Sequence, residues 1–423
     1  MKLWSYEVLD GVFFKKEKTF QYIHFITPPL HNFCLMSLNL LPLTRPIIYA
    51  IDAWSANQKK KSGVETYAYQ LIQTMKQHPL EQNERVVLYS PTKLQGPLAE
   101  LPNGWEEKTL SWPFRFGWMQ GRVSLELFRR PPSVFFVPAQ GIPRRLPTVS
   151  CPIVTTIHDV GFARRPDLYD AASRKRLVKL TKRSVRNASH LITISEFSKS
   201  EIVSIYRVSP DRITTTHLAA DTSIYKQLSQ EEIEPVLERN RLGKHFFLYV
   251  GRLDQKKNVE TIIRAFDQFK LDRGVGDPYE LVLVGEPGFG FASMKNWIDH
   301  ARSKDQIHTL GYLETSDIAA LMNAATAFLF PSWYEGFGIP NLEALACGAP
   351  LILSDIPAHR EVIGDAGLFV SPENADAFAK AMKQIVEDPT FKETLNQKGL
   401  ARTALFDWKK TAEKTWEVLK GLV

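Results

Sequence analysis

The chain has 423 residues, too many for one compact core, and its length predicts two or three domains. It is 44% hydrophobic and 23% charged, which is typical of a globular protein and excludes a disordered or fibrous one. The net charge of +7 is compatible with three kinds of partner: nucleic acid, an anionic membrane surface or a phosphate-bearing small molecule.

Residues 1–44 differ in character from the rest of the chain. They are apolar and aromatic, but the run KKEK interrupts them, and they lack the order of a secretory signal. No apolar run in the chain reaches the ~20 residues needed to span a bilayer. We expect 1–44 to lie outside the fold, either as an interfacial anchor or, preferably, as upstream sequence translated from an early start. Three widely spaced cysteines, an odd number, favour a reducing cytosol.

From Arg45 onward, short apolar runs alternate with amphipathic segments, which is the pattern of parallel sheets with crossover helices. In the first half we expect strands at 47–51, 86–89, 134–137, 154–157, 191–194 and 213–216, and helices at 63–76, 171–187 and 195–206. The polar segment around 227–242 indicates a linker and a short helix. We expect an N-terminal domain over 45–235.

A second alternating series follows the linker. Its expected strands are 246–250, 281–284, 307–310, 327–330, 351–353 and 368–370, and its expected helices are 259–270, 294–301, 316–325, 341–346, 375–386 and 408–422. We expect a second domain over 236–405 and a final helix, 406–423. The predicted fold class is α/β, with two Rossmann-like doubly wound domains that face each other across a cleft, where such sheets usually bind ligands.

The stretch FPSWYEGFGIPNLEALACGAP, residues 330–350, joins a strand to a helix through a glycine-rich turn. Gly336 and Gly338 permit exposed backbone amides, and Pro340 suits the first helical position, so the helix start is an anion site. Glu335 and Glu343 flank it, and each carboxylate can accept hydrogen bonds from vicinal hydroxyls. A nucleotide sugar, with phosphates between two hydroxyl-rich groups, fits this layout. Alternatively, Glu335 is a solvated turn residue and Glu343 is an ordinary charge at the helix N-terminus.

Three further motifs follow predicted strands. In GRLDQKKN, 251–258, Arg252 and Lys257 are placed to neutralise a diphosphate, each charge-assisted bond contributing roughly 1.5–3 kcal/mol. In IVTTIHDVGF, 153–162, His158 is either a ligand of a sugar hydroxyl or a packed histidine. In KKKSGVE, 59–65, Gly63 permits close approach to a phosphate or sugar, whereas the lysines are more simply read as a solvated loop.

Taken in order, these motifs resemble those of the retaining GT-B glycosyltransferases of family 4. EGFGIPNLEA is similar to the E-x7-E element of that family, and GRLDQKKN is similar to its G-R-L-x-x-x-K-N donor loop. TIHDVGF, ITISEFSKSEI and SDIPAHREVIGDAG also match, so the likeness covers roughly 46–419. The last helix is expected to cross back to the first domain.

The resemblance implies roles for these residues. Arg252 and Lys257 would neutralise the donor diphosphate, and the amides of Gly336, Phe337 and Gly338 would hold phosphate and sugar hydroxyls. It also implies that Glu335 binds the far side of the transferred sugar, that Glu343 binds the ribose, and that His158 contacts the sugar near its sixth carbon. Glu335 and His158 are the expected catalytic residues. No metal and no cofactor other than the nucleotide-sugar substrate is expected.

The resemblance also implies a hexosyltransferase that retains the anomeric configuration, acting on a saccharide or lipid-linked acceptor in polysaccharide, O-antigen or glycoconjugate synthesis. TIHDV and SDIPAHREV look most like mannosyltransferase members, which suggests GDP-mannose, with a UDP-hexose such as UDP-glucose as the alternative donor. The sequence departs from the family pattern at Ser62-Gly63 and at 218–221. The resemblance implies that the N-terminal domain binds the acceptor, so these departures concern the identity of the acceptor more than the transfer chemistry. A sugar-nucleotide epimerase shares the scaffold and is the alternative enzyme.

Two partner classes remain. A basic protein that binds nucleic acid would rest on charge alone, and no nucleic-acid motif supports it, so no nucleic-acid partner is expected. The run FRFGW, 114–118, lies near Arg122, Arg129, Arg130, Arg144 and Arg145 in the sequence. It indicates either peripheral contact with anionic lipid or ordinary core aromatics beside a solvated basic face. The expected location is cytoplasmic, with peripheral contact at the inner face of the membrane as the second expectation.

Overall fold

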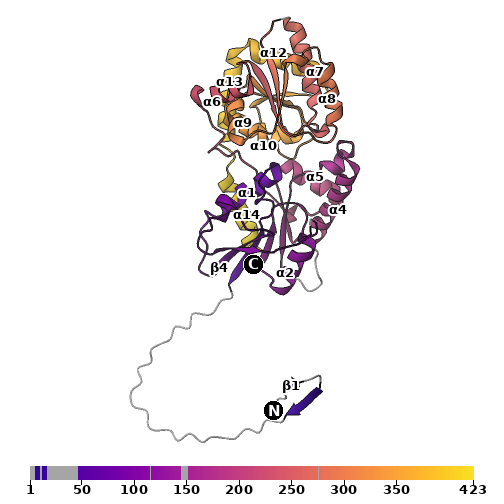
Figure 1. Cartoon of the computed structure of the whole chain (residues 1–423), viewed down its shortest axis with the longest axis vertical. Coiled ribbons are helices and arrows are strands. Elements are labelled where there is room, and N and C mark those ends of the chain that lie inside the picture. Colours follow the sequence, from indigo (N-terminus) through magenta and orange to yellow (C-terminus); the bar gives the residue numbers. More distant parts are fainter. Residues whose placement is uncertain (1–4, 10–11, 17–45, 115, 144–150, 275) are drawn as a thin grey trace, which may run out of the picture. The chain divides into compact units, whose positions relative to one another are not determined.

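The structure is a computed structural model that describes residues 5–9, 12–16, 46–114, 116–143, 151–274 and 276–423. Contacts divide the chain into two compact units, Met1–Thr44 and Arg45–Val423. In the first unit, β1 (Ser5–Leu9) and β2 (Val12–Lys16) form an antiparallel pair. The second unit contains both Rossmann-like domains (Figure 1).

The first domain is built on a seven-stranded sheet in the order β5-β4-β3-β6-β7-β8-β9, and all its pairs are parallel. The order reverses between β3 and β6, which is the switch point where doubly wound sheets bind ligands. The strands are β3 (Ile47–Asp52), β4 (Glu84–Ser90), β5 (Trp105–Thr109), β6 (Val134–Val137), β7 (Ile153–Ile157), β8 (His190–Thr193) and β9 (Ile213–Thr215).

The second domain repeats this plan with six parallel strands in the order β12-β11-β10-β13-β14-β15, so its switch point lies between β10 and β13. The strands are β10 (Phe246–Val250), β11 (Glu280–Val284), β12 (Ile307–Gly311), β13 (Ala327–Phe330), β14 (Leu351–Ser354) and β15 (Gly367–Val370). The two sheets confirm the predicted α/β class.

Helices cover both sheets. In the first domain they are α1 (Gly63–Met75), α2 (Ser124–Arg129), α3 (Gly161–Arg164), α4 (Ala171–Asn187) and α5 (Glu196–Tyr206), with a π-helical turn η2 at Met119–Val123. Those of the second are α6 (Gln230–Asn240), α7 (Val259–Arg273), α8 (Phe291–His300), α9 (Thr315–Ala324), α10 (Ile339–Ala346), α11 (Pro357–Ile363), α12 (Ala375–Glu387) and α13 (Pro389–Thr403), and α14 (Trp408–Lys420) ends the chain.

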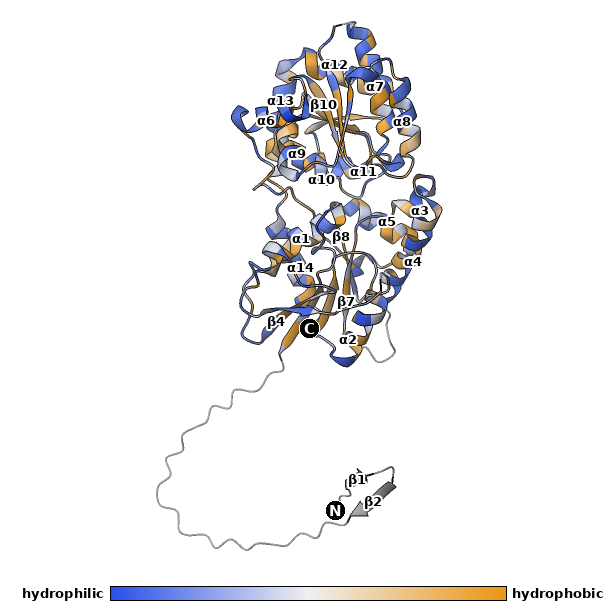
Figure 2. Ribbon diagram, in the orientation of Figure 1, coloured by the Kyte–Doolittle hydropathy of each residue, from blue (hydrophilic) through white to orange (hydrophobic). Residues whose placement is uncertain are grey.

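Both cores are formed by the central strands, because these are buried on both faces. The run FFLYV of β10 and the run AFLF of β13 are almost entirely buried, and Leu248 is in register with Val282 on one side and with Phe328 on the other. Hydropathic colouring shows the same contrast between apolar strands and polar outer helix faces (Figure 2). Continuous apolar runs of this kind are what parallel sheets require.

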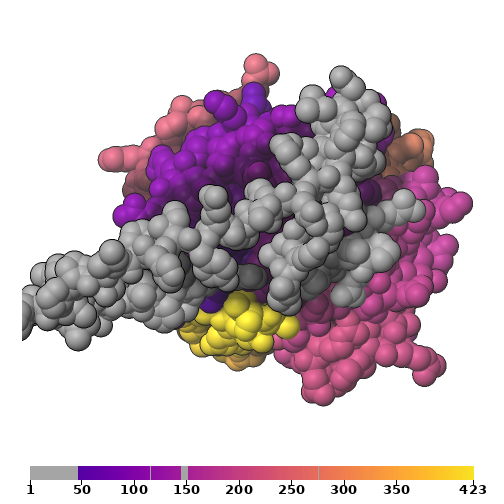
Figure 3. All heavy atoms as spheres, turned by 90° about the horizontal axis from the view of Figure 1, so that it is seen from below, coloured from indigo at the N-terminus to yellow at the C-terminus, as the bar shows by residue number. Residues whose placement is uncertain are grey.

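The final helix α14 packs on the first domain, against α1, as the sequence predicts. The ring of Trp416 meets Tyr49 of β3 edge to face at 5.2 Å, and Lys420 pairs with the buried Glu84 at 3.1 Å. The C-terminal residues accordingly lie at the surface beside residues of the first domain (Figure 3). The chain therefore forms the first domain, then the second, and its last helix packs on the first domain again.

Side-chain to backbone contacts fix the two domains against each other. The carboxylate of Glu361, on α11, accepts hydrogen bonds from the amides of Glu196 and Phe197 at the start of α5, at 2.7 and 2.8 Å. A carboxylate at a helix N-terminus is stabilised by the exposed amides and the helix dipole. The same carboxylate lies 3.0 Å from His217 Nε2. This contact brings the carboxyl edges of both sheets together.

The structure differs from the sequence prediction at several elements. The strand Trp105–Thr109 and the helix Pro389–Thr403 were not expected. Helix α10 begins at Ile339, so Pro340 occupies the second helical position and not the first. For FRFGW the two alternatives divide between residues: Trp118 is buried and donates to the carbonyl of Leu110, whereas Phe114 and Phe116 are exposed. Residues 144 and 145 lie outside the described residues.

Candidate active site

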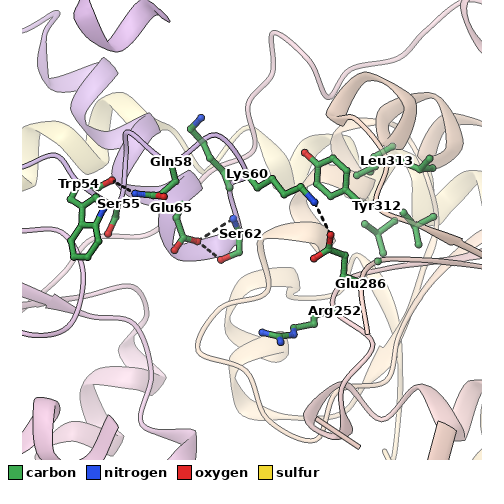
Figure 4. A pocket seen from close by; sticks show the side chains of 16 residues that line it. Trp54, Ser55, Gln58, Lys60, Ser62, Glu65, Arg252, Glu286, Tyr312 and Leu313 are labelled. Carbon is green, nitrogen blue, oxygen red and sulfur yellow. Dashed lines mark hydrogen bonds and ion pairs between the residues drawn. The ribbon is translucent and has the colours of Figure 1, made fainter. Parts of the chain in front are cut away.

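A cavity of about 670 Å³ lies at the carboxyl edges of the two sheets. This volume is typical of a small-molecule site. One wall comes from the loop after β3 and the start of α1, and the other comes from the loops that follow β10, β11 and β12. Figure 4 shows Trp54, Gln58 and Glu65 on one side and Glu286, Tyr312 and Leu313 on the other.

Arg252 lies on the wall of this cavity, directly after β10. Its loop packs tightly on the loop after β11, because a Cβ at Gly285 would lie 1.9 Å from the carbonyl oxygen of Gly251. The amide of Gly251 also donates to Val284. Only glycine at position 285 permits this approach. The exposed guanidinium therefore stands on a fixed backbone at the sheet edge, where it can bind a diphosphate bidentately.

Glu335 and Lys257 are joined to each other, which the sequence did not predict. Lys257 Nζ donates to Glu335 Oε1 at 2.6 Å and lies over the ring of Phe330, and Glu335 is only 6% exposed. Burial would raise the pKa of Glu335, but the ammonium groups of Lys257 and Lys256 lower it to about 2. The carboxylate is therefore ionised at neutral pH and can accept hydrogen bonds from hydroxyls.

Lys256 is a further charged residue of this cluster, and the sequence prediction had not included it. Its Nζ lies 3.6 Å from Asp159 Oδ2 on the first domain. Burial opposes its charge, but the carboxylates of Asp159 and Glu335 raise its pKa well above the ordinary value. The neighbouring lysines on the 3-10 turn Gln255–Lys257 thus contact different carboxylates. The only indication of Lys256 in the sequence was its position next to Lys257 in the motif GRLDQKKN.

The turn Glu335–Gly338 touches the first domain. The carbonyl of Gly336 accepts a hydrogen bond from Ser195 Oγ at 2.6 Å, and the Phe337 ring is buried against Phe406. Gly338 has a φ of 91°, which favours glycine. Within the part of the chain that the structure describes, the amides of residues 336–338 donate no hydrogen bond. These amides are free to donate to a ligand, so their predicted binding of phosphate or hydroxyls stays a prediction, whereas the Phe337 side chain serves packing.

Two glycines of the predicted site make a matched test. A Cβ at Gly336 would lie 2.5 Å from the carbonyl of His158, whereas a Cβ at Gly63 would meet no atom within 4 Å. We expect Gly336→Ala to lower both activity and melting temperature, because backbone must move. Gly63→Ala should leave the melting temperature unchanged and lower activity only if a ligand approaches Gly63. Thermal unfolding and initial rates of both variants check this; an unperturbed Gly336→Ala would contradict the contact.

His158 lies just beyond the carboxyl end of β7. Its Nε2 is 3.1 Å from the carbonyl oxygen of Pro138, and its ring meets Tyr67 edge to face at 4.8 Å. Because a carbonyl can only accept, Nε2 carries the proton and Nδ1 is left as an acceptor. Burial lowers the pKa of His158. The histidine is therefore neutral at pH 7, held in one tautomer, and able to accept a hydrogen bond at Nδ1.

Glu343 and Gly63 line a neighbouring cavity of about 510 Å³, which shares Lys61, Ser62, Tyr312 and Leu313 with the first. The structure thus brings Glu343 and Gly63 to one cavity and Arg252 to the other. Glu335, Lys257 and His158 lie at the contact between the two domains and line neither cavity. The pKa of Glu343 is raised to about 8 by burial, although the hydroxyl of Tyr225 donates to its carboxylate.

The raised pKa of Glu343 predicts a pH-dependent stability. The folded protein retains a proton on Glu343 that the unfolded chain has already released, so the free energy of unfolding falls as pH rises from about 5 to 8. We expect Glu343→Gln to be more stable than the wild type by about 3–5 kcal/mol at pH 9 and nearly equal at pH 5. Urea titrations at both pH values measure this; equal stability at pH 9 would contradict it.

Lys60 is exposed, as expected for a solvated loop, and it also contacts the second domain. Its Nζ lies 2.9 Å from Glu286 Oε1 and 5.0 Å from the centre of the Tyr312 ring. Both side chains of the ion pair remain exposed, so the pair contributes little to stability. Among the described residues, no cluster of histidine, cysteine, aspartate or glutamate is arranged to hold a metal ion.

Two protein-family models match this chain, one over each domain. The family model described as "Glycosyltransferase Family 4" matches residues 61–224, and "Glycosyl transferases group 1" matches residues 230–402. The O-antigen chain mannosyltransferase B of Escherichia coli is 32% identical over 270 residues, which cover 64% of this chain and 70% of that protein. The O-antigen chain mannosyltransferase RfbU of Salmonella typhimurium is 28% identical over 55% of this chain and 61% of its own length.

A solved structure supports the architecture. The crystal structure of HepE from Anabaena, in complex with UDP and glucose, superposes with a TM-score of 0.66 at 19% identity and covers 89% of this chain and 100% of that one. The two parallel sheets therefore have the GT-B architecture. This chain belongs to glycosyltransferase family 4, and it is a glycosyltransferase.

Proposed function

We propose that this glycosyltransferase moves mannose from GDP-mannose to a saccharide or lipid-linked acceptor, with retention of configuration, in the synthesis of O-antigen or a related polysaccharide. The mannosyltransferase names of two relatives support the sugar and the pathway. The proposal rests on one arrangement of groups. Arg252 lies on the cavity wall, the ionised Glu335 is held by Lys257, and the backbone amides of residues 336–338 donate no hydrogen bond within the described part of the chain.

Each residue then has a defined task. Arg252 and the amides of 336–338 bind the diphosphate, where the leaving group gains negative charge during transfer. Lys257 neutralises charge nearby and holds Glu335 in place. The carboxylate of Glu335 accepts hydrogen bonds from hydroxyls of the transferred sugar. Glu343, which carries a proton at neutral pH, accepts one from the ribose at its carbonyl oxygen. The neutral His158 accepts a hydrogen bond at Nδ1 from a hydroxyl of the same sugar.

Retention without a covalent intermediate requires the acceptor hydroxyl to attack the face from which the diphosphate leaves. The proton of the acceptor then passes to a phosphate oxygen as the bond from the sugar to the phosphate breaks. In this arrangement the carboxylate of Glu335, whose pKa is about 2, has no tendency to take up a proton at neutral pH. It serves to bind and orient the sugar, so no general base from the protein is needed.

The donor is tested by a screen. The purified enzyme is incubated with GDP-mannose, UDP-glucose and related nucleotide sugars, and nucleotide release is measured with and without saccharide acceptors. We expect acceptor-dependent release from GDP-mannose. Release from UDP-glucose alone would assign the alternative donor, which the structural likeness to an enzyme crystallised with UDP and glucose favours. Conversion of the donor to an epimer without any acceptor would overturn the proposal in favour of an epimerase.

We also propose cytoplasmic location with peripheral contact at an anionic bilayer. Helix α4 has the sequence AASRKRLVKLTKRSVRN, which is rich in cations and has no acidic residue. Arg183 near its end donates to Gln120 of η2, while Phe114 and Phe116 on the preceding loop are 67% and 74% exposed. Basic charge beside exposed aromatic rings is complementary to anionic headgroups. No helix in the described part of the chain is both long and apolar enough to cross a bilayer.

Sedimentation with lipid vesicles tests this contact. We expect binding to vesicles that contain phosphatidylglycerol, loss of binding at high salt, and weaker binding after Phe114→Ala with Phe116→Ala. Phe289→Ala, which removes an exposed phenylalanine from the second domain, is the control and should bind normally. Equal binding to neutral vesicles, or no binding at all, would contradict the proposal.

A further inference from the structure

Trp54 lies on the wall of the 670 Å³ cavity and is 38% exposed. It follows β3 and projects from the first-domain side of the cavity, while Arg252 belongs to the opposite, second-domain side (Figure 4). A large aromatic surface left open at a cavity wall is an apolar surface that a ligand can cover. None of the roles described so far uses it.

The indole of Trp54 is held in place. Its backbone amide donates to Asp52 Oδ1 at 3.0 Å, and its carbonyl accepts from Gln58 Nε2 at 3.1 Å. Its ring meets the buried ring of Trp118 edge to face, with 5.5 Å between centroids. A side chain that is already ordered loses little conformational entropy when a ligand covers it.

Polar groups stand on the same wall. Glu65, in the first turn of α1, accepts a hydrogen bond from the amide of Ser62 at 3.1 Å, and its carboxylate lines the cavity beside Gln58 and Ser55. A pyranose ring has C–H groups on its faces and hydroxyls around its edge. An aromatic face with carboxylate and amide acceptors beside it can therefore bind such a ring by stacking and by hydrogen bonds.

We propose that Trp54 is the stacking platform for the acceptor sugar and that Glu65 and Gln58 bind hydroxyls of the same sugar. The inference rests on the proposed retaining transfer, in which the acceptor hydroxyl must lie beside the donor diphosphate. Trp54 and Arg252 share one cavity, which meets that requirement. Trp54 is thus a specificity-determining residue for the acceptor and has no part in donor binding.

Saturation-transfer NMR tests the platform directly. The probes are methyl α-D-mannopyranoside, α-1,3-mannobiose and methyl β-N-acetylglucosaminide, each titrated into wild type, Trp54→Ala and Trp54→Phe. The matched control is Trp297→Ala, because Trp297 is also 38% exposed but lies on α8, outside this cavity. Binding of GDP and UDP is measured in parallel by calorimetry, together with the melting temperature.

We expect the wild type to bind at least one probe, with saturation transferred most strongly to C–H protons of one ring face. Trp54→Ala should weaken that binding at least about fivefold, and Trp54→Phe should retain most of it. The affinity of Trp54→Ala for GDP and UDP should equal that of the wild type. The Trp297→Ala variant should bind the saccharide probes as the wild type does.

Unaltered saccharide binding in Trp54→Ala would overturn the inference, and so would the absence of binding by every probe to the wild type. A parallel loss of nucleotide affinity or of melting temperature would also overturn it, because Trp54 would then be structural. Failure of the proposed donor chemistry has a different signature: the wild type would transfer no mannose, while saccharide binding would still depend on Trp54.

Discussion

Replacing Glu335 with glutamine is expected to lower kcat at least about 100-fold. The substitution keeps the size of the side chain but removes the charge that Lys257 holds in place at 2.6 Å. Hydrogen bonds from sugar hydroxyls to a carboxylate are stronger than those to an amide, and the difference grows as positive charge develops on the sugar during transfer. Initial rates at saturating donor and acceptor measure the loss.

Because Glu335 is buried and paired, its removal also leaves an uncompensated lysine and reduces stability. Glu126 provides a matched control: it is 5% exposed, its Oε1 lies 2.6 Å from Lys108 Nζ, and it lines neither cavity. We expect Glu126→Gln to lower the melting temperature comparably while leaving kcat unchanged. A Glu335→Gln enzyme with kcat within a few-fold of the wild type would contradict the role given to this residue.

Replacing Arg252 with alanine is expected to weaken binding of a nucleoside diphosphate about 10- to 100-fold. The guanidinium lines the cavity on a loop fixed by the close contact of Gly251 and Gly285. Its loss should have less effect on a nucleoside monophosphate and least on a nucleoside. Arg252→Lys should recover only part of the affinity, because lysine keeps the charge without the bidentate geometry. Calorimetry with the three ligands measures the series.

Arg264→Ala is the control for Arg252. Arg264 lies on α7 of the same domain, where its guanidinium is 5.5 Å from the centre of the Trp297 ring, and it does not line either cavity of the proposed site. Its removal should leave nucleotide binding unchanged. An equal loss of affinity for nucleoside and diphosphate in Arg252→Ala would show that the arginine does not recognise phosphate.

The pattern of apolar runs was sufficient to predict both sheets, because central parallel strands are buried on both faces and read as continuous hydrophobic segments. The strand WEEKT, residues 105–109, escaped prediction because it lies at the edge of its sheet and carries three consecutive charges. The helix Pro389–Thr403 escaped because it lacks a clear apolar face, with only Leu395, Gly399 and Thr403 buried. Elements at a sheet edge or on the surface bury few side chains, so they lack the hydrophobic periodicity from which a strand or helix is predicted.

The site was predictable in its residue types and less so in its contacts. The motifs indicated Lys257 and Glu335 separately, but their pairing joins residues 78 positions apart and required the fold. The contact of Gly336 with the carbonyl of His158 likewise depends on how the two domains meet. Trp54 gave no signal, because one tryptophan after a strand resembles any core residue until its exposure is known. Local motifs predict chemistry, whereas tertiary contacts decide orientation.

The most direct test of the account is a time course by NMR with GDP-α-mannose and a saccharide acceptor, in which the anomeric configuration of the first product is read. If the acceptor attacks beside the diphosphate held by Arg252, the first product is α-linked and GDP is released in equal amount. A β-linked first product would contradict the retaining mechanism, and an epimerised nucleotide sugar formed without acceptor would contradict the transfer itself.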